Sequence, residues 1–193
     1  MSDDDLDEDP GWRLSPRMLL YMVPGYLGYE TRRGGNARHD GLETIRQVFL
    51  TFSFTIVLFG LVLVAVVHGE EKAPAGPWII GVAIASALSL GAEEVVGRRR
   101  LDCADPITLG TTYRAHFFTR IAIAMSIALL AFVGAMTVSE WWLYWMFLPF
   151  ALGGLARAAP TRGHLASDQD QLYADGCHLS LVRALRQLRS TSN

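Results

Sequence analysis

The chain has 193 residues, of which 51% are hydrophobic and 19% are charged. The charged fraction is below the roughly 25% that is usual in soluble domains, and the high apolar fraction excludes a chain that is disordered throughout. The formal net charge of −2 hides an uneven distribution of charged residues along the chain.

Residues 1–44 are expected to form a cytoplasmic N-terminal region. Six acidic residues between Asp3 and Asp9 predict a disordered tail. Residues 15–29 are mostly apolar, but they are too short to cross a bilayer and are interrupted by Pro24 and Gly25. This segment is predicted to lie in the lipid headgroup region, to pack beneath the helices that follow, or to dock onto a partner. Residues 31–40 are rich in glycine and charge and read as a loop.

Four apolar blocks follow, each close to the about 20 residues that a helix needs to cross a bilayer. Because backbone groups in lipid must be satisfied within the segment, we expect the blocks to be helices. Their central parts lack the polar stripe that a soluble bundle would need. The sequence therefore predicts an all-α, polytopic membrane protein with a four-transmembrane-helix bundle over residues 45–159. The spans are expected at about residues 49–67, 77–97, 117–138 and 141–159.

Residues 160–193 are expected to form a cytoplasmic tail of amphipathic helix. Ser167 is a plausible N-cap, and Gly176 is expected to interrupt the helix. Beyond Gly176, Leu181 and Leu185 fall on one face, and arginines gather toward the end. A basic amphipathic helix of this kind attaches to the inner leaflet, binds a partner helix, or folds back onto the protein's own loops.

The distribution of arginine predicts the orientation of the spans. Six arginines precede the first span, four lie between the second and third, and five follow from Arg157 onward, whereas the opposite side holds only Lys72. Since cytoplasmic loops are enriched in basic residues, both termini are expected in the cytoplasm of a multi-pass cell-membrane protein, beside anionic inner-leaflet lipids. An aromatic belt is then expected at the outer interface, made by Trp78, Trp141, Trp142 and Trp145.

Charged residues near the spans are the candidate site, because a charge there is costly unless it is paired or functional. Glu93 and Glu94 lie about one turn inside the cytoplasmic end of the second span, and Arg120 and Arg157 lie at a similar depth in the third and fourth. We expect a nearly neutral, buried structural network. The alternative is a site for an ion or a lipid headgroup that faces the cytoplasm.

Small residues in the second span predict helix packing. Gly81, Ala85 and Ser89 recur every four residues, and Gly91 belongs to a second such row. This spacing lets membrane helices approach closely, so the second and third spans are expected to form the tightest pair.

The two cysteines, Cys103 and Cys177, both fall on the side predicted to be cytoplasmic, where thiols are kept reduced. We therefore expect two ordinary thiols and no structural disulfide. Neither belongs to a spacing that is typical of metal ligands.

No motif typical of an enzyme occurs, and no cofactor, metal ion or nucleic-acid partner is expected. The first hypothesis is a non-enzymatic accessory or assembly subunit of a larger inner-membrane complex. The second is a small transporter or channel that acts as a homo-oligomer. The third is a membrane-embedded, lipid-modifying enzyme. Two groups of side chains could serve it: one at a helix start, with His39, Asp40 and Glu43, and one in the second cytoplasmic loop, with Asp102, Asp105 and His116.

Overall fold

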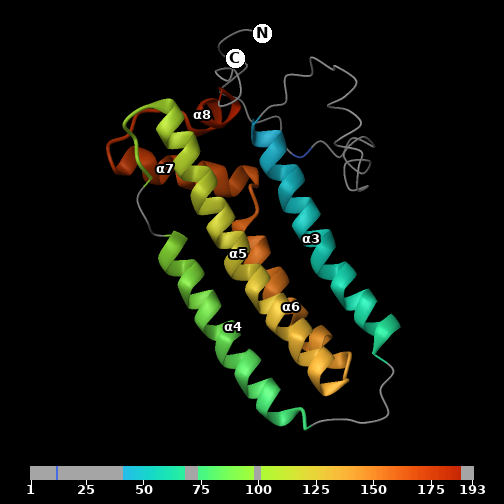
Figure 1. Cartoon of the computed structure of the whole chain (residues 1–193). Coiled ribbons are helices and arrows are strands. Elements are labelled where there is room, and N and C mark those ends of the chain that lie inside the picture. Colours follow the sequence, from blue (N-terminus) through green and yellow to red (C-terminus); the bar gives the residue numbers. More distant parts are fainter. Residues whose placement is uncertain (1–11, 13–40, 68–73, 98–100, 188–193) are drawn as a thin grey trace, which may run out of the picture. The chain divides into compact units, whose positions relative to one another are not determined.

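The computed structural model describes Trp12 and residues 41–67, 74–97 and 101–187 (Figure 1). All regular structure within these ranges is helical. The predicted acidic tail, the apolar segment at 15–29 and the loop at 31–40 lie outside the described residues, as do Lys72, Arg98, Arg99 and Arg100. The helices are α3 (Gly41–Val66), α4 (Gly76–Gly97), α5 (Pro106–Val138), α6 (Trp142–Ala158), α7 (Arg162–Ala174) and α8 (Leu181–Gln187).

Three of these helices, α3, α4 and α5, are long and apolar enough to cross a membrane. This confirms the prediction of a helical, multi-pass membrane protein. The fourth apolar block forms α6, which has 17 residues and contains Pro149.

α5 begins at Pro106, well before the span expected from residue 117. Asp105 caps it, because Asp105 Oδ1 accepts hydrogen bonds from the backbone N–H groups of Ile107 at 2.8 Å and Thr108 at 2.9 Å. Proline suits the first helical position, where its missing N–H would have had no helical partner. The early start was not predicted because hydropathy reports the apolar part of a helix and not its polar first turns.

The chain divides into two compact units. We call residues Phe52–Arg99 and His116–Ala158 the four-helix unit, and Met1–Thr51, Arg100–Ala115 and Ala159–Asn193 the terminal unit.

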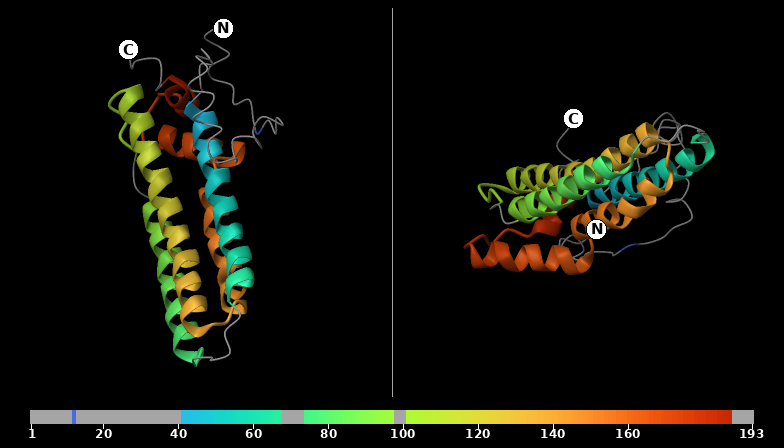
Figure 2. Two further views of the ribbon diagram at one scale, coloured as in Figure 1. Left: turned by 45° about the vertical axis from the view of Figure 1, so that its right-hand side comes forward. Right: turned by 90° about the horizontal axis from the view of Figure 1, so that it is seen from below.

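In the four-helix unit, α4 packs closely against α6, and the unit also contains parts of α3 and α5 (Figures 1 and 2). α5 contributes a row of small buried residues at Ala124, Ala128, Ala131 and Ala135, each at most 1% exposed. α6 buries eight residues, including Tyr144 and Leu155. By contrast, α4 buries only Val82, Ser86 and Glu93.

In the terminal unit, α7 and α8 pack together around a small apolar core. Thr161, and not the predicted Ser167, caps α7 by accepting a hydrogen bond from the backbone N–H of His164 at 3.2 Å. Gly176, with φ of 86°, separates α7 from α8 in a conformation that suits glycine. The core includes Leu42, Ile45, Leu109, Leu165, Leu172, Leu181 and Leu185. The apolar face of α8 is therefore buried against the chain itself.

Candidate functional site

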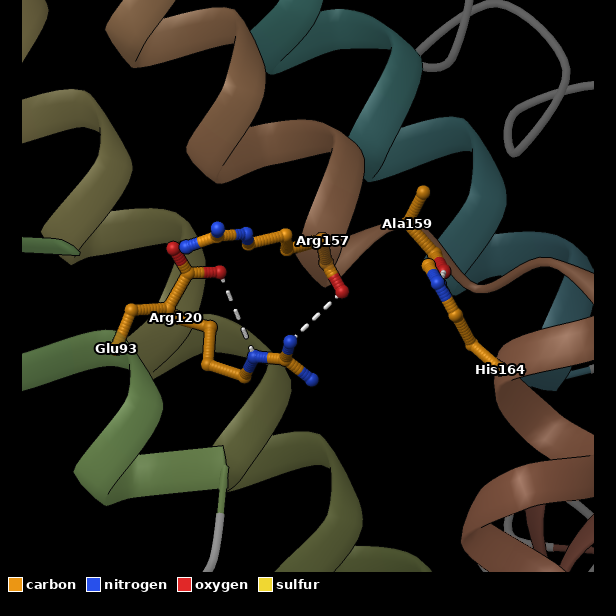
Figure 3. A network of polar contacts seen from close by, with 5 residues as sticks. All are labelled: Glu93, Arg120, Arg157, Ala159 and His164. Atoms are coloured by element: carbon orange, nitrogen blue, oxygen red, sulfur yellow. Dashed lines mark hydrogen bonds and ion pairs between the residues drawn. The ribbon is translucent and has the colours of Figure 1, made fainter. Parts of the chain in front are cut away.

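The charges that the sequence places near the membrane boundary lie on three helices of the four-helix unit. Glu93 is near the C-terminal end of α4, Arg120 is in α5, and Arg157 is in the last turn of α6. Figure 3 shows the side chains of Arg120 and Arg157 extending toward the Glu93 carboxylate. We call these three residues the charge network.

Arg120 joins the other two members of the charge network. Its Nε lies 3.7 Å from Glu93 Oε1, which makes an ion pair between α5 and α4. Its Nη2 donates a hydrogen bond of 2.7 Å to the backbone carbonyl oxygen of Arg157, which ties α5 to α6 (Figure 3). One guanidinium thus connects three helices, an arrangement that its several rigidly placed donors allow.

Glu93 is the enclosed member of the charge network. Its side chain is 2% exposed, whereas that of Arg120 is 25% exposed. Within the described part of the chain, neither carboxylate oxygen has a hydrogen-bond partner. The ion pair with Arg120 and the nearby charge of Arg157 are what compensate its burial.

A glycine makes room for this carboxylate. A Cβ atom added at Gly154 on α6 would lie 3.3 Å from Glu93 Oε2 and 3.0 Å from the Cβ of Ala124 on α5. Gly154 therefore lets α6 approach both α4 and α5 at the level of the network. The adjacent Gly153 has open space at its Cβ position, and hydropathy does not reveal which of the two glycines faces a neighbour.

Glu94 has a different environment from Glu93. It is exposed, and so is the side chain of Arg157, although the Arg157 backbone carbonyl is engaged by Arg120. The ion pair with Arg120 thus involves the first of the two adjacent glutamates.

The predicted packing residues of α4 are not all at contacts. Nothing lies within 4 Å of a Cβ added at Gly81 or Gly91, and both residues are exposed. Ala85 and Ser89 are half-buried, and the Ser89 hydroxyl lies 3.3 Å from that of Ser126 on α5. α4 instead faces its neighbours with Val82, Ser86 and Glu93 and packs closely against α6. The spacing of small residues does not predict which face of α4 contacts its neighbours, because this helix is apolar nearly all round.

The tryptophans gather toward the other end of the four-helix unit. Trp78 is near the start of α4, where its ring lies 3.1 Å from the Cβ position of Gly134 on α5. Trp141 and Trp142 are exposed at the start of α6, and Trp145 lies beside Gly60 of α3. At the rise of an ideal helix, the distance along the axis is about 22 Å from Trp78 to Glu93 in α4 and from Trp142 to Arg157 in α6. This is less than the roughly 30 Å of a hydrocarbon core.

A buried tyrosine was not anticipated. Tyr144 on α6 is fully buried and donates a hydrogen bond to the backbone carbonyl oxygen of Ile56 on α3. The ring reaches this oxygen because Gly60 has no side chain, and a Cβ there would lie 3.0 Å from Tyr144 Cε1. This hydrogen bond depends on which helices pair, and hydropathy does not report helix pairing.

The cysteines of the terminal unit correct the expectation of two thiols. Cys103 and Cys177 form a disulfide, with Cα atoms 6.1 Å apart across 74 positions of sequence. The expectation rested on compartment alone, and the sequence offered no sign that the segment before α5 meets the segment after α7. Cys177 is 6% exposed.

Asp102 and Asp105, two acidic residues of the enzyme hypothesis, serve as a turn cap and a helix cap, whereas His39 and Asp40 lie outside the described residues. Asp102 Oδ1 accepts from the backbone N–H of Ala104 at 3.1 Å, and both carboxylate oxygens of Asp105 accept hydrogen bonds near the start of α5. Among the described residues, no three His, Cys, Asp or Glu side chains come together as a metal site.

No protein-family model, curated protein sequence or solved structure matches this chain.

Proposed function

We propose that the chain is a four-span membrane protein and a non-enzymatic accessory or assembly subunit of a larger membrane complex. The observation that carries this proposal is the enclosure of Glu93. Its carboxylate faces Arg120 and lies against the Cβ position of Gly154, and this pairing favours a structural role over transport for the buried acid.

Packing supports α6 as the fourth span. Its 17 residues would extend about 26 Å, near the lower limit for a spanning helix. It packs closely against α4 and takes part in contacts with α3 and α5, including the Tyr144 and Arg120 hydrogen bonds. A helix that packs along three spans shares their environment.

We further propose that both termini are cytoplasmic, in the cell membrane, on the strength of the arginine distribution. The Cys103–Cys177 disulfide weighs against this orientation, because structural disulfides persist mainly in oxidising compartments. Labelling with a membrane-impermeant maleimide after reduction decides the matter. Labelling of Cys103 only after the cells are opened supports the proposal, and labelling in intact cells contradicts it.

The subunit proposal is tested by extracting the full chain from its native membrane directly into polymer nanodiscs. Mass photometry then measures the mass of the particle, and quantitative proteomics measures the stoichiometry of its components. We expect a particle that contains at least one other membrane protein in fixed ratio. Particles that contain one copy of this chain, or only copies of it, contradict the proposal, and the second result favours the oligomeric transporter.

A further inference from the structure

We propose that the terminal unit contains a binding pocket for an anionic amphiphile, a molecule with one phosphate or carboxylate group and an acyl chain. The pocket is a cavity of about 730 Å³ formed by α7, α8, the segment between them and Pro106 at the start of α5. This volume lies within the about 300–1,000 Å³ that is usual for small-molecule sites. All the lining residues belong to the terminal unit.

The basic side chains that line the cavity favour an anion. Arg162 on α7, His178 in the connecting segment and Arg183 on α8 approach it from three parts of the chain. No aspartate or glutamate is among the described residues that line it. Asp105, the acid that directly precedes Pro106, directs both carboxylate oxygens to Ile107 and Thr108. The guanidinium group of arginine matches the geometry of phosphate and carboxylate oxygens.

The same cavity has an apolar wall. Leu165 is buried beneath it, and Leu179 and Val182 are half-buried at its side. Tyr173, which is 50% exposed, also lines the cavity and combines an aromatic surface with a hydroxyl group. A small hydrated anion would leave this apolar surface in water, whereas an acyl chain would cover it. The combination of arginines and apolar side chains therefore points to an amphiphile.

Two features hold the walls in place. The Gln169 side chain bridges α7 to the start of α8, since its Nε2 donates to Leu179 O at 3.0 Å and its Oε1 accepts from the Leu181 N–H at 2.7 Å. The Cys103–Cys177 disulfide ties the segment before Pro106 to the residue before His178. A site whose walls are already fixed loses less conformational entropy when a ligand binds.

Native mass spectrometry of the full-length chain, released from a non-ionic detergent, tests the proposal with four probes. These are dioctanoyl phosphatidylglycerol, the matched zwitterion dioctanoyl phosphatidylcholine, dodecanoate, and glycerol 3-phosphate, which lacks an acyl chain. We expect phosphatidylglycerol or dodecanoate to bind at least about tenfold more tightly than phosphatidylcholine and glycerol 3-phosphate. Tighter binding of phosphatidylglycerol indicates a phospholipid ligand, and tighter binding of dodecanoate indicates a fatty acid. Equal binding of anionic and zwitterionic lipid, or of glycerol 3-phosphate and phosphatidylglycerol, overturns the proposal.

Variants locate the binding in the pocket. Arg183→Gln is expected to weaken binding of the preferred probe about tenfold, whereas Arg186→Gln, which removes the same charge from α8 outside the lining, is expected to leave it unchanged. Ala166→Phe fills the cavity while keeping its charges and is expected to abolish binding. Thermal unfolding of each variant shows that it folds. Equal losses for Arg183→Gln and Arg186→Gln, or full binding by a folded Ala166→Phe protein, contradict the assignment.

Discussion

Arg120 holds Glu93 and the backbone of Arg157 at the same time, through an ion pair of 3.7 Å and a hydrogen bond of 2.7 Å. Glu93 is almost completely buried, and both of its oxygens lack a hydrogen-bond partner among the described residues. Removing one member of such a pair leaves a buried charge uncompensated, which is more damaging than removing both. The difference between single and double substitutions therefore tests the charge network.

The adjacent glutamates provide the first test. Arg120→Gln removes the cation that faces Glu93 and is expected to lower the free energy of unfolding by about 3–5 kcal/mol. Glu93→Gln is also expected to destabilise the protein, because Arg120 then loses its partner. Glu94→Gln, at an exposed position, is expected to change stability by less than about 0.5 kcal/mol. Thermal unfolding in a mild detergent measures all three, and similar effects at the two glutamates would show that burial does not distinguish them.

The paired glycines of α6 provide a second comparison. Gly154→Ala is expected to destabilise the protein by about 1–3 kcal/mol, because the new Cβ would meet Ala124 and Glu93. Gly153→Ala makes the same chemical change one position away, where nothing lies within 4 Å, and is expected to be neutral or slightly stabilising. Chemical denaturation of both variants measures the difference. A larger loss of stability in Gly153→Ala than in Gly154→Ala would show that α6 turns the Gly153 face, and not the Gly154 face, toward its neighbours.

The Tyr144 hydrogen bond predicts a third result. Tyr144→Phe is expected to cost about 0.5–1.5 kcal/mol, the net value of a typical buried hydrogen bond, without loss of the fold. Gly60→Ala is expected to cost more, since its Cβ would lie 2.9 Å from the Trp145 ring and 3.0 Å from Tyr144. Thermal unfolding of the two single variants tests this order. A stable Gly60→Ala protein would mean that α3 and α6 are farther apart than described.

Asp105 predicts a dependence on pH. Hydrogen bonds from the Thr108 hydroxyl and from the Thr108 and Ile107 backbone N–H groups lower the pKa of the Asp105 carboxyl. Because the folded pKa lies below the unfolded one, the stabilisation is present at pH values above the unfolded pKa. It is lost as the pH falls through the folded pKa.

The difference in Tm between the wild type and Asp105→Ala is therefore expected to be largest near neutral pH and to shrink below about pH 4. Thr108→Val, which removes the hydroxyl donor, is expected to reproduce part of the effect. A Tm difference that grows as the pH falls would have the opposite sign and would remove Asp105 as the cap of α5.

The sequence predicts the helical class well because long apolar runs in a chain of low charge have few alternatives. It also points to Glu93, Arg120 and Arg157, since charges in such runs are rare. It does not predict that Glu93 and not Glu94 is enclosed, or that Gly154 and not Gly81 meets a neighbour. α4 is apolar nearly all round, so its periodicity carries little information about the face it buries.

Contacts between distant segments are also beyond the sequence pattern. Nothing in the local sequence places Cys103 beside Cys177, or the Tyr144 hydroxyl beside the Ile56 carbonyl. Both depend on how distant segments pack together, which hydropathy does not report.

A double-mutant cycle between Glu93 and Arg120 tests most directly whether the network holds the helices together. Its members are the wild type, Glu93→Gln, Arg120→Gln and the double variant, and the measurement is the free energy of unfolding in one detergent. The structure predicts a coupling free energy of about 1–3 kcal/mol, with the double variant more stable than the sum of the two single losses implies. Strictly additive losses would contradict a structural ion pair and would return Glu93 to the candidates for a transport site.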